Sequence, residues 1–419
     1  MNAESILQSY QHFGVHLGLE RIHQLLQKLD NPHQQVPIIH IAGTNGKGSV
    51  CAYLSSVLTE AGYRVGRYTS PHLIDWAERI CINQKPISST QLQQCLERVV
   101  AATQNNTETP TQFEIITAAA WLYFAEQKTD IAVIETGLGG RLDATNVCET
   151  PLASVITSIS LEHWQILGPT VADIAGEKAG ILKSKCPAVI GELPESARIV
   201  IEKRIQELDC PATWVKPAID LGQGFAEYQL TQNAEKIKYQ LPLLGKIQLM
   251  NSALAIATLQ ILQNQGWQIS PTAIENGIAK TQWPGRLQQT TWKNRKILID
   301  GAHNPAAAIA LREYVDNLNS SQPINWVIGI LATKDCDDIL KALLKKGDRL
   351  YLVPVPDQNS SSPAKLAALA QIICPELTLC QAFPDLTTAL DAAVTGDNLT
   401  ILCGSLYLVG YFLQQQSQA

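Results

Sequence analysis

The chain has 419 residues, of which 46% are hydrophobic and 17% charged, with a formal net charge of −6. This length exceeds that of one compact core and predicts two domains, and the composition excludes a disordered chain. The acidic balance argues against a nucleic-acid partner, and there is no run of about 18 apolar residues that would predict a membrane span.

Ten cysteines are scattered along the chain without a C-x-x-C pair, which predicts buried thiols in a reducing compartment. The N-terminus lacks a basic region followed by an apolar run, so we expect no signal peptide. The sequence therefore predicts a cytoplasmic protein, which we expect to be a monomer.

Apolar, β-branched strands alternate with helical stretches through the first part of the chain. This alternation predicts an α/β fold with a mostly parallel sheet and helices on both faces. A more alternating stretch at 225–244 predicts an antiparallel hairpin at an edge, and a long helix is expected at 248–265. The expected strands are 36–42, 64–70, 130–136, 152–160 and 187–191, and the other expected helices are 48–62, 89–104, 113–127 and 170–182.

A proline-glycine break at 281–288 precedes a second α/β series, with strands expected at 296–300, 324–331, 349–355 and 399–404. We place the domain boundary near 290, which divides the chain into 1–289 and a smaller domain of 290–419.

The stretch "HIAGTNGKGSV" (40–50) has the order strand, glycine-rich turn and helix that a phosphate-binding loop requires. The common pattern is G-x-x-x-x-G-K-[ST], in which a serine or threonine follows the lysine directly. Here Gly48 follows Lys47, and Ser49 comes one position later. Backbone N–H groups at such a turn point at an anion, and Lys47 can reach terminal phosphates. The alternative is a tight turn with a surface lysine.

The segment "ETGLGGRLDATN" (135–146) places Glu135 at the carboxyl end of a strand, where ligands of parallel sheets collect. A carboxylate opposite a phosphate loop is a natural ligand for Mg²⁺, which is shared with phosphates. Arg141 and Asp143 have the alternative of pairing with each other.

Three further residues lie near expected strand ends or in the next helix. Ser70 in "TSPHL" and His163 in "SLEHWQILG" each have an ordinary interpretation as a turn or a cap. Lys178 in "GEKAG" has no lone pair when charged and cannot bind a metal in that form. For Lys178 the residue types alone favour a surface lysine or a partner for Glu177.

In the second domain, "IDGAHNP" (299–305) also ends a strand and carries Asp300, His303 and Asn304. Arg286 in "WPGR" lies at the interdomain link, and Asn251 lies near the start of the long helix. Each of these residues alone could be a helix cap, a turn residue or a hinge contact, but together they suggest a nucleotide held between two domains.

These segments, in this order, resemble folylpolyglutamate synthase/dihydrofolate synthase, a family of Mur-ligase-like ATP-dependent amide ligases. The resemblance runs from residue 40 to 410, and "GTNGKGS", "GLGGRLDATN" and "DGAHNP" are its most specific parts. It implies an N-terminal P-loop-type sheet domain carrying a pterin site and a C-terminal Rossmann-like glutamate-ligase domain.

The resemblance also implies roles for individual residues. Two Mg²⁺ ions would be held, one by Ser70 and Glu135, the other by Glu135, His163 and a carbamylated Lys178. Lys47, Lys178, Arg286 and His303 would be the catalytic residues. The ATP-binding residues would be Thr44, Asn45, Gly46, Lys47, Gly48, Ser49, Asn251, Arg286 and Asp300, and the folate-side residues Thr111, Gln112, Phe113, Glu114, Leu142, Asp143 and Ala144. The segment "HLGLERI" (16–22) resembles the family's pterin-side segment more loosely, and no role is carried onto His16.

The function expected from the resemblance is ATP-dependent addition of L-glutamate to a folate-type carboxylate through an acyl phosphate. The acceptor would be dihydropteroate, a folate or both. The alternatives are a Mur-type ligase acting on a different carboxylate and a nucleotide-binding regulatory protein that ligates nothing.

Overall fold

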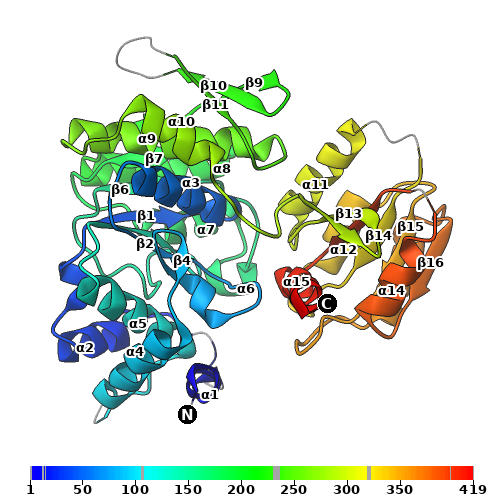
Figure 1. Ribbon diagram of the computed structural model, residues 1–419, viewed down its shortest axis with the longest axis horizontal. Helices are drawn as coiled ribbons and strands as arrows, with labels where there is room; N and C mark the ends of the chain where they lie inside the picture. Colours follow the sequence, from blue (N-terminus) through cyan, green and yellow to red (C-terminus); the bar gives the residue numbers. More distant parts are fainter. Residues whose placement is uncertain are drawn as a thin grey trace. The chain divides into compact units, whose positions relative to one another are not determined.

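The computed structural model describes residues 2–11, 14, 16–104, 108–229, 236–318, 322–396 and 398–418. Contacts divide the chain into two compact units (Figure 1). The first comprises Met1–Pro242 and Gln248–Gln282, and the second comprises Leu243–Ile247 and Trp283–Ala419. The functional division between residues 289 and 290 stays a prediction.

The first unit is built on an eight-stranded sheet in the order β4-β3-β2-β5-β1-β6-β7-β8. From β2 to β8 the neighbouring strands run parallel, and β3 and β4 add an antiparallel edge. The predicted mostly parallel sheet is confirmed, but β3, β4 and β8 were not predicted because such short strands show no period. The strands are β1 (Ile38–Ala42), β2 (Val65–Tyr68), β3 (Ile80–Ile82), β4 (Lys85–Pro86), β5 (Ile131–Glu135), β6 (Ala153–Ile156), β7 (Ala188–Ile190) and β8 (Ala212–Trp214).

Helices cover both faces of this sheet, as the apolar strands predict (Figure 1). On one face α4 and α5 pack over Ile38, Tyr68 and Ile134, and α7 and α8 pack over Ile156 and Ile190. On the other face α3 contacts β1, β2, β5 and α10. The helices are α1 (Ala3–Gln8), α2 (Glu20–Lys28), α3 (Lys47–Glu60), α4 (Ser89–Ala102), α5 (Gln112–Glu126), α6 (Trp164–Leu167), α7 (Val171–Ala179), α8 (Glu195–Leu208), α9 (Ile247–Asn264) and α10 (Pro271–Ala279).

The stretch expected to form an edge hairpin forms a separate sheet. β10 (Phe225–Gln229) pairs antiparallel with β11 (Lys236–Gln240) and with β9 (Ile219–Gly222). The hairpin is therefore confirmed, but its position at an edge of the main sheet is wrong. Its alternate side chains, such as Tyr228 and Tyr239, are buried, and β11 contacts α10. Residues 230–235 of the stretch lie outside the described part.

The second unit is a six-stranded sheet in the order β12-β13-β17-β14-β15-β16, parallel except for β12. Its core surrounds Trp326 and Leu350, and the predicted second α/β series is confirmed. The strands are β12 (Gln288–Trp292), β13 (Arg295–Ile299), β14 (Asn325–Ile328), β15 (Arg349–Leu352), β16 (Leu379–Ala382) and β17 (Thr400–Cys403), and the helices are α11 (Pro305–Asn317), α12 (Cys336–Leu343), α13 (Pro363–Ile373), α14 (Leu386–Ala393) and α15 (Leu406–Gln418). Among the described helices, none combines the length and the apolar character that crossing a membrane requires.

Candidate active site

The phosphate-type loop connects β1 to α3 at the middle of the first sheet. β1 lies between β5 and β6, and the strands that follow it in sequence are placed first on its β5 side and then on its β6 side. Ligands of open α/β sheets bind at the point where the strand order reverses in this way. The loop is tied to the segment after β6: Thr44 N donates to Ser158 O at 2.7 Å, and Asn45 N donates to Ser158 Oγ at 3.1 Å. The loop is therefore preformed.

Lys47 is the first residue of α3, and its side chain lies back over the loop. Its Nζ donates to Gly43 O at 3.0 Å and to Thr44 O at 3.2 Å, and lies 4.0 Å from Glu135 Oε1. Only 15% of the side chain is exposed, which contradicts the alternative of a surface lysine. The ammonium lies beside the loop whose N–H groups would bind phosphate.

Ser49 and Asn251 are linked by hydrogen bonds to a third residue, Gln248, which the sequence analysis did not single out. The buried Gln248 on α9 donates from Nε2 to Ser49 Oγ at 3.4 Å, and its Oε1 accepts from Asn251 Nδ2 at 3.0 Å. A buried amide in an apolar helix was the available signal, since such groups are hydrogen-bonded. The predicted ATP-binding residues of the first unit, Gly48 included, therefore lie on the loop, on the start of α3 and on α9.

Gly46 adopts a backbone conformation that favours glycine, with φ +89°, and a Cβ there would lie 2.5 Å from Asn251 Oδ1. We expect Gly46→Ala to lower the free energy of unfolding by more than the roughly 1–2 kcal/mol of the left-handed backbone alone. It should also weaken ADP binding, because Asn251 must move.

Gly62 offers a matched control, because its φ is +94° and a Cβ there would meet nothing within 4 Å. Chemical denaturation and calorimetric ADP titration of both variants separate the two effects. Equal losses of stability and unchanged ADP affinity in Gly46→Ala and Gly62→Ala would contradict a role for the Gly46–Asn251 contact.

Ser70 and Glu135 lie together at the carboxyl ends of β2 and β5. The amide of Ser70 donates to Glu135 Oε2 at 3.2 Å, and only 4% of Glu135 is exposed. β2 and β5 are adjacent parallel strands, which explains why two residues 65 positions apart meet. A serine hydroxyl and a carboxylate beside a phosphate loop are the hard oxygen donors that Mg²⁺ prefers.

Lys178 is buried, with 5% exposed, and its Nζ donates to Gly43 O at 2.7 Å. Both alternatives for this residue are wrong, because it is neither a surface lysine nor the partner of Glu177. Burial lowers the pKa of Lys178 to about 7, the nearby charge of Lys47 adds to this, and Glu162 and Asp143 oppose it. An amine of this pKa is substantially neutral near pH 7.

His163 lies at the start of α6, just beyond β6, with φ +52°. Its Nε2 lies 3.9 Å from Glu162 Oε1, and 42% of its side chain is exposed. Within the described residues no group of three or more His, Cys, Asp or Glu side chains is arranged to hold a metal ion. The second predicted metal set, which counts Lys178 as an oxygen donor, stays a prediction.

The loop between β5 and β6 is organised around Asp143, not around an Arg141–Asp143 pair. Asp143 Oδ2 accepts from Leu138 N at 2.7 Å, whereas Arg141 Nη2 donates to Glu177 at 2.7 Å. The alternative pairing is therefore wrong. Burial raises the pKa of Asp143, and backbone hydrogen bonds from its own loop oppose this. Leu142 and Ala144 flank it, and Ala144 is buried.

The segment "TQFE" (111–114) forms the start of α5. Its polar side chains make hydrogen bonds that cap this helix and hold neighbouring backbone. Thr111 is the N-cap, and Glu114 Oε2 accepts from Thr111 N at 2.6 Å, forming a capping box. Gln112 Nε2 donates to Leu7 O at 2.9 Å. The Phe113 ring covers Gly137, where a Cβ would lie 2.9 Å from ring atoms Cε1 and Cε2.

The sequence missed Arg21, which joins the N-terminal segment to this helix. Its Nε lies 3.1 Å from Glu114 Oε2, its Nη2 donates to His16 O at 2.7 Å, and 11% of its side chain is exposed. The sequence shows a charge inside the "HLGLERI" segment and a carboxylate, Glu114, in "TQFE", but only the fold brings the two together and buries them.

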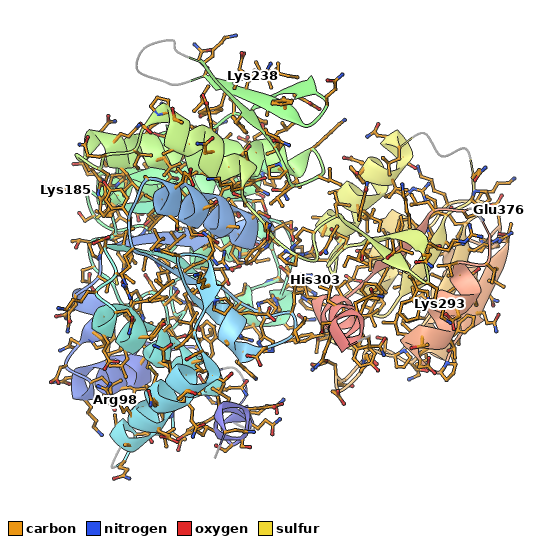
Figure 2. The ribbon with its side chains drawn as sticks, in the orientation of Figure 1. Arg98, Lys185, Lys238, Lys293, His303 and Glu376 are labelled. Carbon is orange, nitrogen blue, oxygen red and sulfur yellow. The ribbon has the colours of Figure 1, made fainter. Side chains whose placement is uncertain are left out.

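In the second unit, Asp300 holds the turn that carries Arg286. Its carboxylate accepts from Leu287 N and Ala302 N, each at 2.8 Å. Burial raises the pKa of Asp300, and the charge of Arg286 opposes this. His303 is labelled in Figure 2. Its Nδ1 lies 2.7 Å from Gly301 O, and Asn304 caps α11. The three predicted residues of this unit, Arg286, Asp300 and His303, are thus gathered at the carboxyl end of β13.

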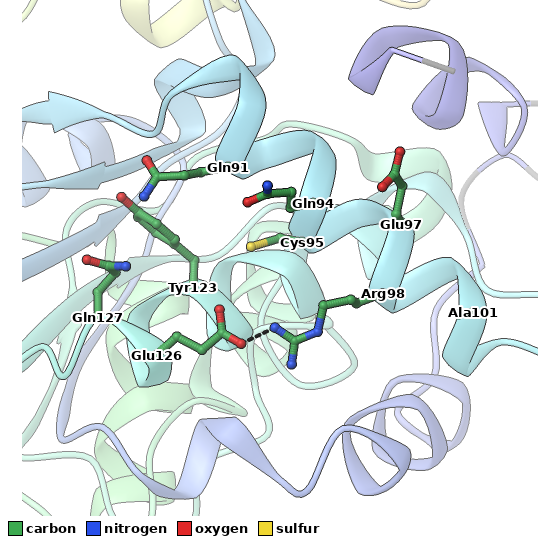
Figure 3. A pocket seen from close by; sticks show the side chains of 9 residues that line it. All are labelled: Gln91, Gln94, Cys95, Glu97, Arg98, Ala101, Tyr123, Glu126 and Gln127. Atoms are coloured by element: carbon green, nitrogen blue, oxygen red, sulfur yellow. Dashed lines mark hydrogen bonds and ion pairs between the residues drawn. The ribbon is translucent and has the colours of Figure 1, made fainter.

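Two surface hollows lie on the first unit. One, of about 500 Å³, lies between α4 and α5 and is lined by residues such as Gln91, Tyr123 and Arg98, none of which was predicted (Figure 3). The other, of about 580 Å³, is lined by Arg141 and Glu177 beside the Asp143 loop. Neither is lined by the predicted ATP-binding residues.

Comparisons with known proteins cover both units. The model of the Mur ligase middle domain matches residues 41–259, and that of the C-terminal domain of dihydrofolate synthetase matches residues 284–415. The probable dihydrofolate synthetase of Schizosaccharomyces pombe is 36% identical, over 94% of this chain and 97% of its own length. The dihydrofolate synthase/folylpolyglutamate synthase of Bacillus subtilis is 34% identical, over 97% of each chain.

Solved structures of two related proteins are similar to this chain over nearly its whole length. Escherichia coli FolC in complex with DHPP and ADP is 29% identical with a TM-score of 0.87, covering 100% of this chain and 98% of its own. Mycobacterium tuberculosis folylpolyglutamate synthase complexed with ADP and AMPPCP is 30% identical with a TM-score of 0.86, covering 99% of each.

The unit that carries the phosphate loop matches the Mur ligase middle domain, so the chain is an ATP-dependent amide ligase of the Mur type. More narrowly, the chain belongs to the dihydrofolate synthase/folylpolyglutamate synthase family. The family membership sets aside the alternatives of a non-ligating regulator and of a ligase for an unrelated carboxylate.

Proposed function

We propose that this protein joins L-glutamate to a folate-type carboxylate with cleavage of ATP to ADP and phosphate, using dihydropteroate, a reduced folate or both as acceptor. The observation that carries the proposal is the gathering of Lys47, Glu135, Ser70 and Lys178 around the loop after β1, in a chain of this family. The ADP, AMPPCP and DHPP named with the related structures support ATP and a folate-side acceptor.

The chemistry that the residues serve is activation of a carboxylate, which is a poor electrophile. Transfer of the γ-phosphoryl group of ATP gives an acyl phosphate, and the glutamate amine then displaces phosphate. Loop N–H groups and Lys47 hold the transferred group and neutralise its charge. By the family resemblance, Arg286 would add a second cation, and His303 would help hold the incoming glutamate.

The residues present fit Mg²⁺. Ser70 and Glu135 would hold one ion, and Glu135, His163 and a carbamylated Lys178 a second. Bound Mg²⁺ supplies charge neutralisation at phosphate oxygens. Glu135 is suited to this because its carboxylate is buried beside Lys47 and keeps a fixed position through the Ser70 amide.

Lys178 fits carbamylation, in which the neutral amine adds to CO₂ with loss of one proton and becomes an anionic oxygen donor. Burial and the nearby charge of Lys47 lower the pKa of Lys178 to about 7, which favours the neutral amine that this addition needs. Glu162, which acts on the pKa of Lys178, would then face an anion rather than a cation.

The remaining expectations concern the protein as a whole. We place it in the cytoplasm as a monomer without a nucleic-acid partner, in agreement with ten free cysteines and a net charge of −6.

The proposal is tested with purified protein, ATP, Mg²⁺, glutamate and either dihydropteroate or a reduced folate. We expect ADP release that depends on both glutamate and acceptor, with a product heavier by one glutamyl residue in mass spectrometry. Absence of glutamate-dependent ADP release with either acceptor would reject the function.

A further inference from the structure

His40 is a polar side chain in the middle of β1, whose other residues are apolar. Only 1% of it is exposed, and its Nε2 lies 2.8 Å from Thr145 Oγ1, 105 residues along the chain. No role in catalysis or binding follows for His40 or Thr145 from the site described above. A buried polar residue in a central strand is costly unless it is hydrogen-bonded, so this contact calls for an explanation.

The direction of the hydrogen bonds follows from Asp143. Thr145 Oγ1 lies 2.6 Å from Asp143 Oδ1, which also accepts from Thr145 N at 3.0 Å. A carboxylate only accepts, so the Thr145 hydroxyl gives its one hydrogen to Asp143. Thr145 must then accept from His40, whose proton is on Nε2. Burial, with Lys183 adding to it, lowers the pKa of His40 to about 3, so the ring is neutral with a single N–H.

Asp143 is itself only 3% exposed and is occupied by its own loop, accepting from Leu138 N as well as from Thr145. It therefore acts by shaping residues 137–146. The loop is fixed on its other side to α7, since Arg141 N donates to Glu177 O at 2.7 Å and Asn146 Nδ2 to Gly180 O at 3.1 Å.

β1 thus carries two functions at different points. Its end leads into Gly43, whose carbonyl accepts from both Lys47 and Lys178. Its middle carries His40, the first residue of the hydrogen-bonded series His40–Thr145–Asp143. The strand that presents the phosphate loop also sets the position of the loop that contains Leu142, Asp143 and Ala144.

We propose that His40 and Thr145 are positioning residues for the acceptor substrate, holding the Asp143 loop in register with β1 and so controlling affinity for the pterin-bearing carboxylate but not for ATP. This inference rests on the proposed function, because it takes residues 142–144 as part of the acceptor site.

The test compares conservative and disruptive variants at both positions. His40→Gln keeps an N–H donor and Thr145→Ser keeps the hydroxyl, whereas His40→Leu and Thr145→Val remove them. We expect His40→Leu and Thr145→Val to raise KM for the acceptor about tenfold, the effect of one lost buried hydrogen bond, and to change KM for ATP less than about twofold. The conservative variants should restore most of the acceptor affinity.

Thr258→Val is the matched control, because Thr258 is fully buried on α9 and loses a comparable 2.8 Å hydroxyl bond, to Leu254 O. It should leave both KM values within about twofold of wild type, as expected for a distant site. Equal increases of KM for acceptor and ATP in His40→Leu and Thr145→Val would show a merely structural role and overturn the inference. Unchanged acceptor KM would overturn it too.

Hydrogen exchange provides a readout that needs no activity. Loss of the hydrogen bonds that join His40, Thr145 and Asp143 should speed exchange at the amides of Leu138 and Thr145 about tenfold. Exchange at the amides of α3 should be unchanged. Unaltered exchange at both amides in His40→Leu and Thr145→Val would overturn the inference even if the wild type proved inactive. An inactive wild type with the expected exchange would instead reject the proposed function alone.

Discussion

Lys47→Met should lower the rate of glutamate-dependent ADP release by about 10²- to 10³-fold, the usual loss when one donor to a developing charge is removed. The ammonium lies beside the carbonyls of Gly43 and Thr44 and 4.0 Å from Glu135, so it is held at the loop before nucleotide arrives. Methionine keeps the length of the side chain and removes only its charge and donors.

The control is Lys280→Met, which removes an exposed lysine paired with Glu60 at 2.7 Å in the same unit. It should stay within about twofold of the wild-type rate, because exposed ion pairs contribute little. Steady-state ADP release, with ADP affinity by calorimetry, separates lost catalysis from lost binding. A Lys47→Met enzyme with near-normal turnover would contradict the assignment of the loop as the phosphate site.

Lys178→Ala should lose most of the activity, about 10²-fold or more, because the proposed metal ligand and a buried group are removed together. Added acetate or another short carboxylate should restore part of the rate by supplying an anionic oxygen in the space left by the side chain. Retention of near-normal rates by Lys178→Ala would reject the carbamate assignment.

The modification can also be followed without activity, by ¹³C NMR of the protein equilibrated with ¹³CO₂ in the absence of Mg²⁺. The pKa of Lys178 is about 7, so the neutral amine increases as pH rises through 7. The carbamate signal should therefore grow between about pH 6 and pH 8 and be absent from Lys178→Ala. A signal that falls as pH rises, or that survives the substitution, would assign the carbamate elsewhere.

Much of the first unit could be predicted from the sequence because its central strands are apolar runs and its candidate ligand residues follow them. Glu135 and Ser70 were placed at strand ends by this rule, and the parallel pairing of β2 with β5 brings them together. The sequence could not choose a partner for Arg141, because Glu177 lies 36 residues away and reaches it only through the packing of α7 on the loop.

Lys178 shows the other limit of sequence reasoning. Its residue type argued for the surface, and only family resemblance suggested a site, whereas the fold buries it against the carbonyl of Gly43. Arg21, His40 and Gln248 were missed because a single polar residue in an apolar or short segment has no period. Their partners, Glu114, Thr145 and Asn251, are fixed by tertiary packing.

The most direct test of the central claim follows oxygen from the acceptor carboxylate. Acceptor labelled with ¹⁸O in the reacting carboxylate is incubated with the protein, ATP, Mg²⁺ and glutamate, and the inorganic phosphate is analysed by mass spectrometry. Activation as an acyl phosphate predicts transfer of one ¹⁸O atom to each phosphate formed. Unlabelled phosphate accompanying formation of the amide product would contradict the account.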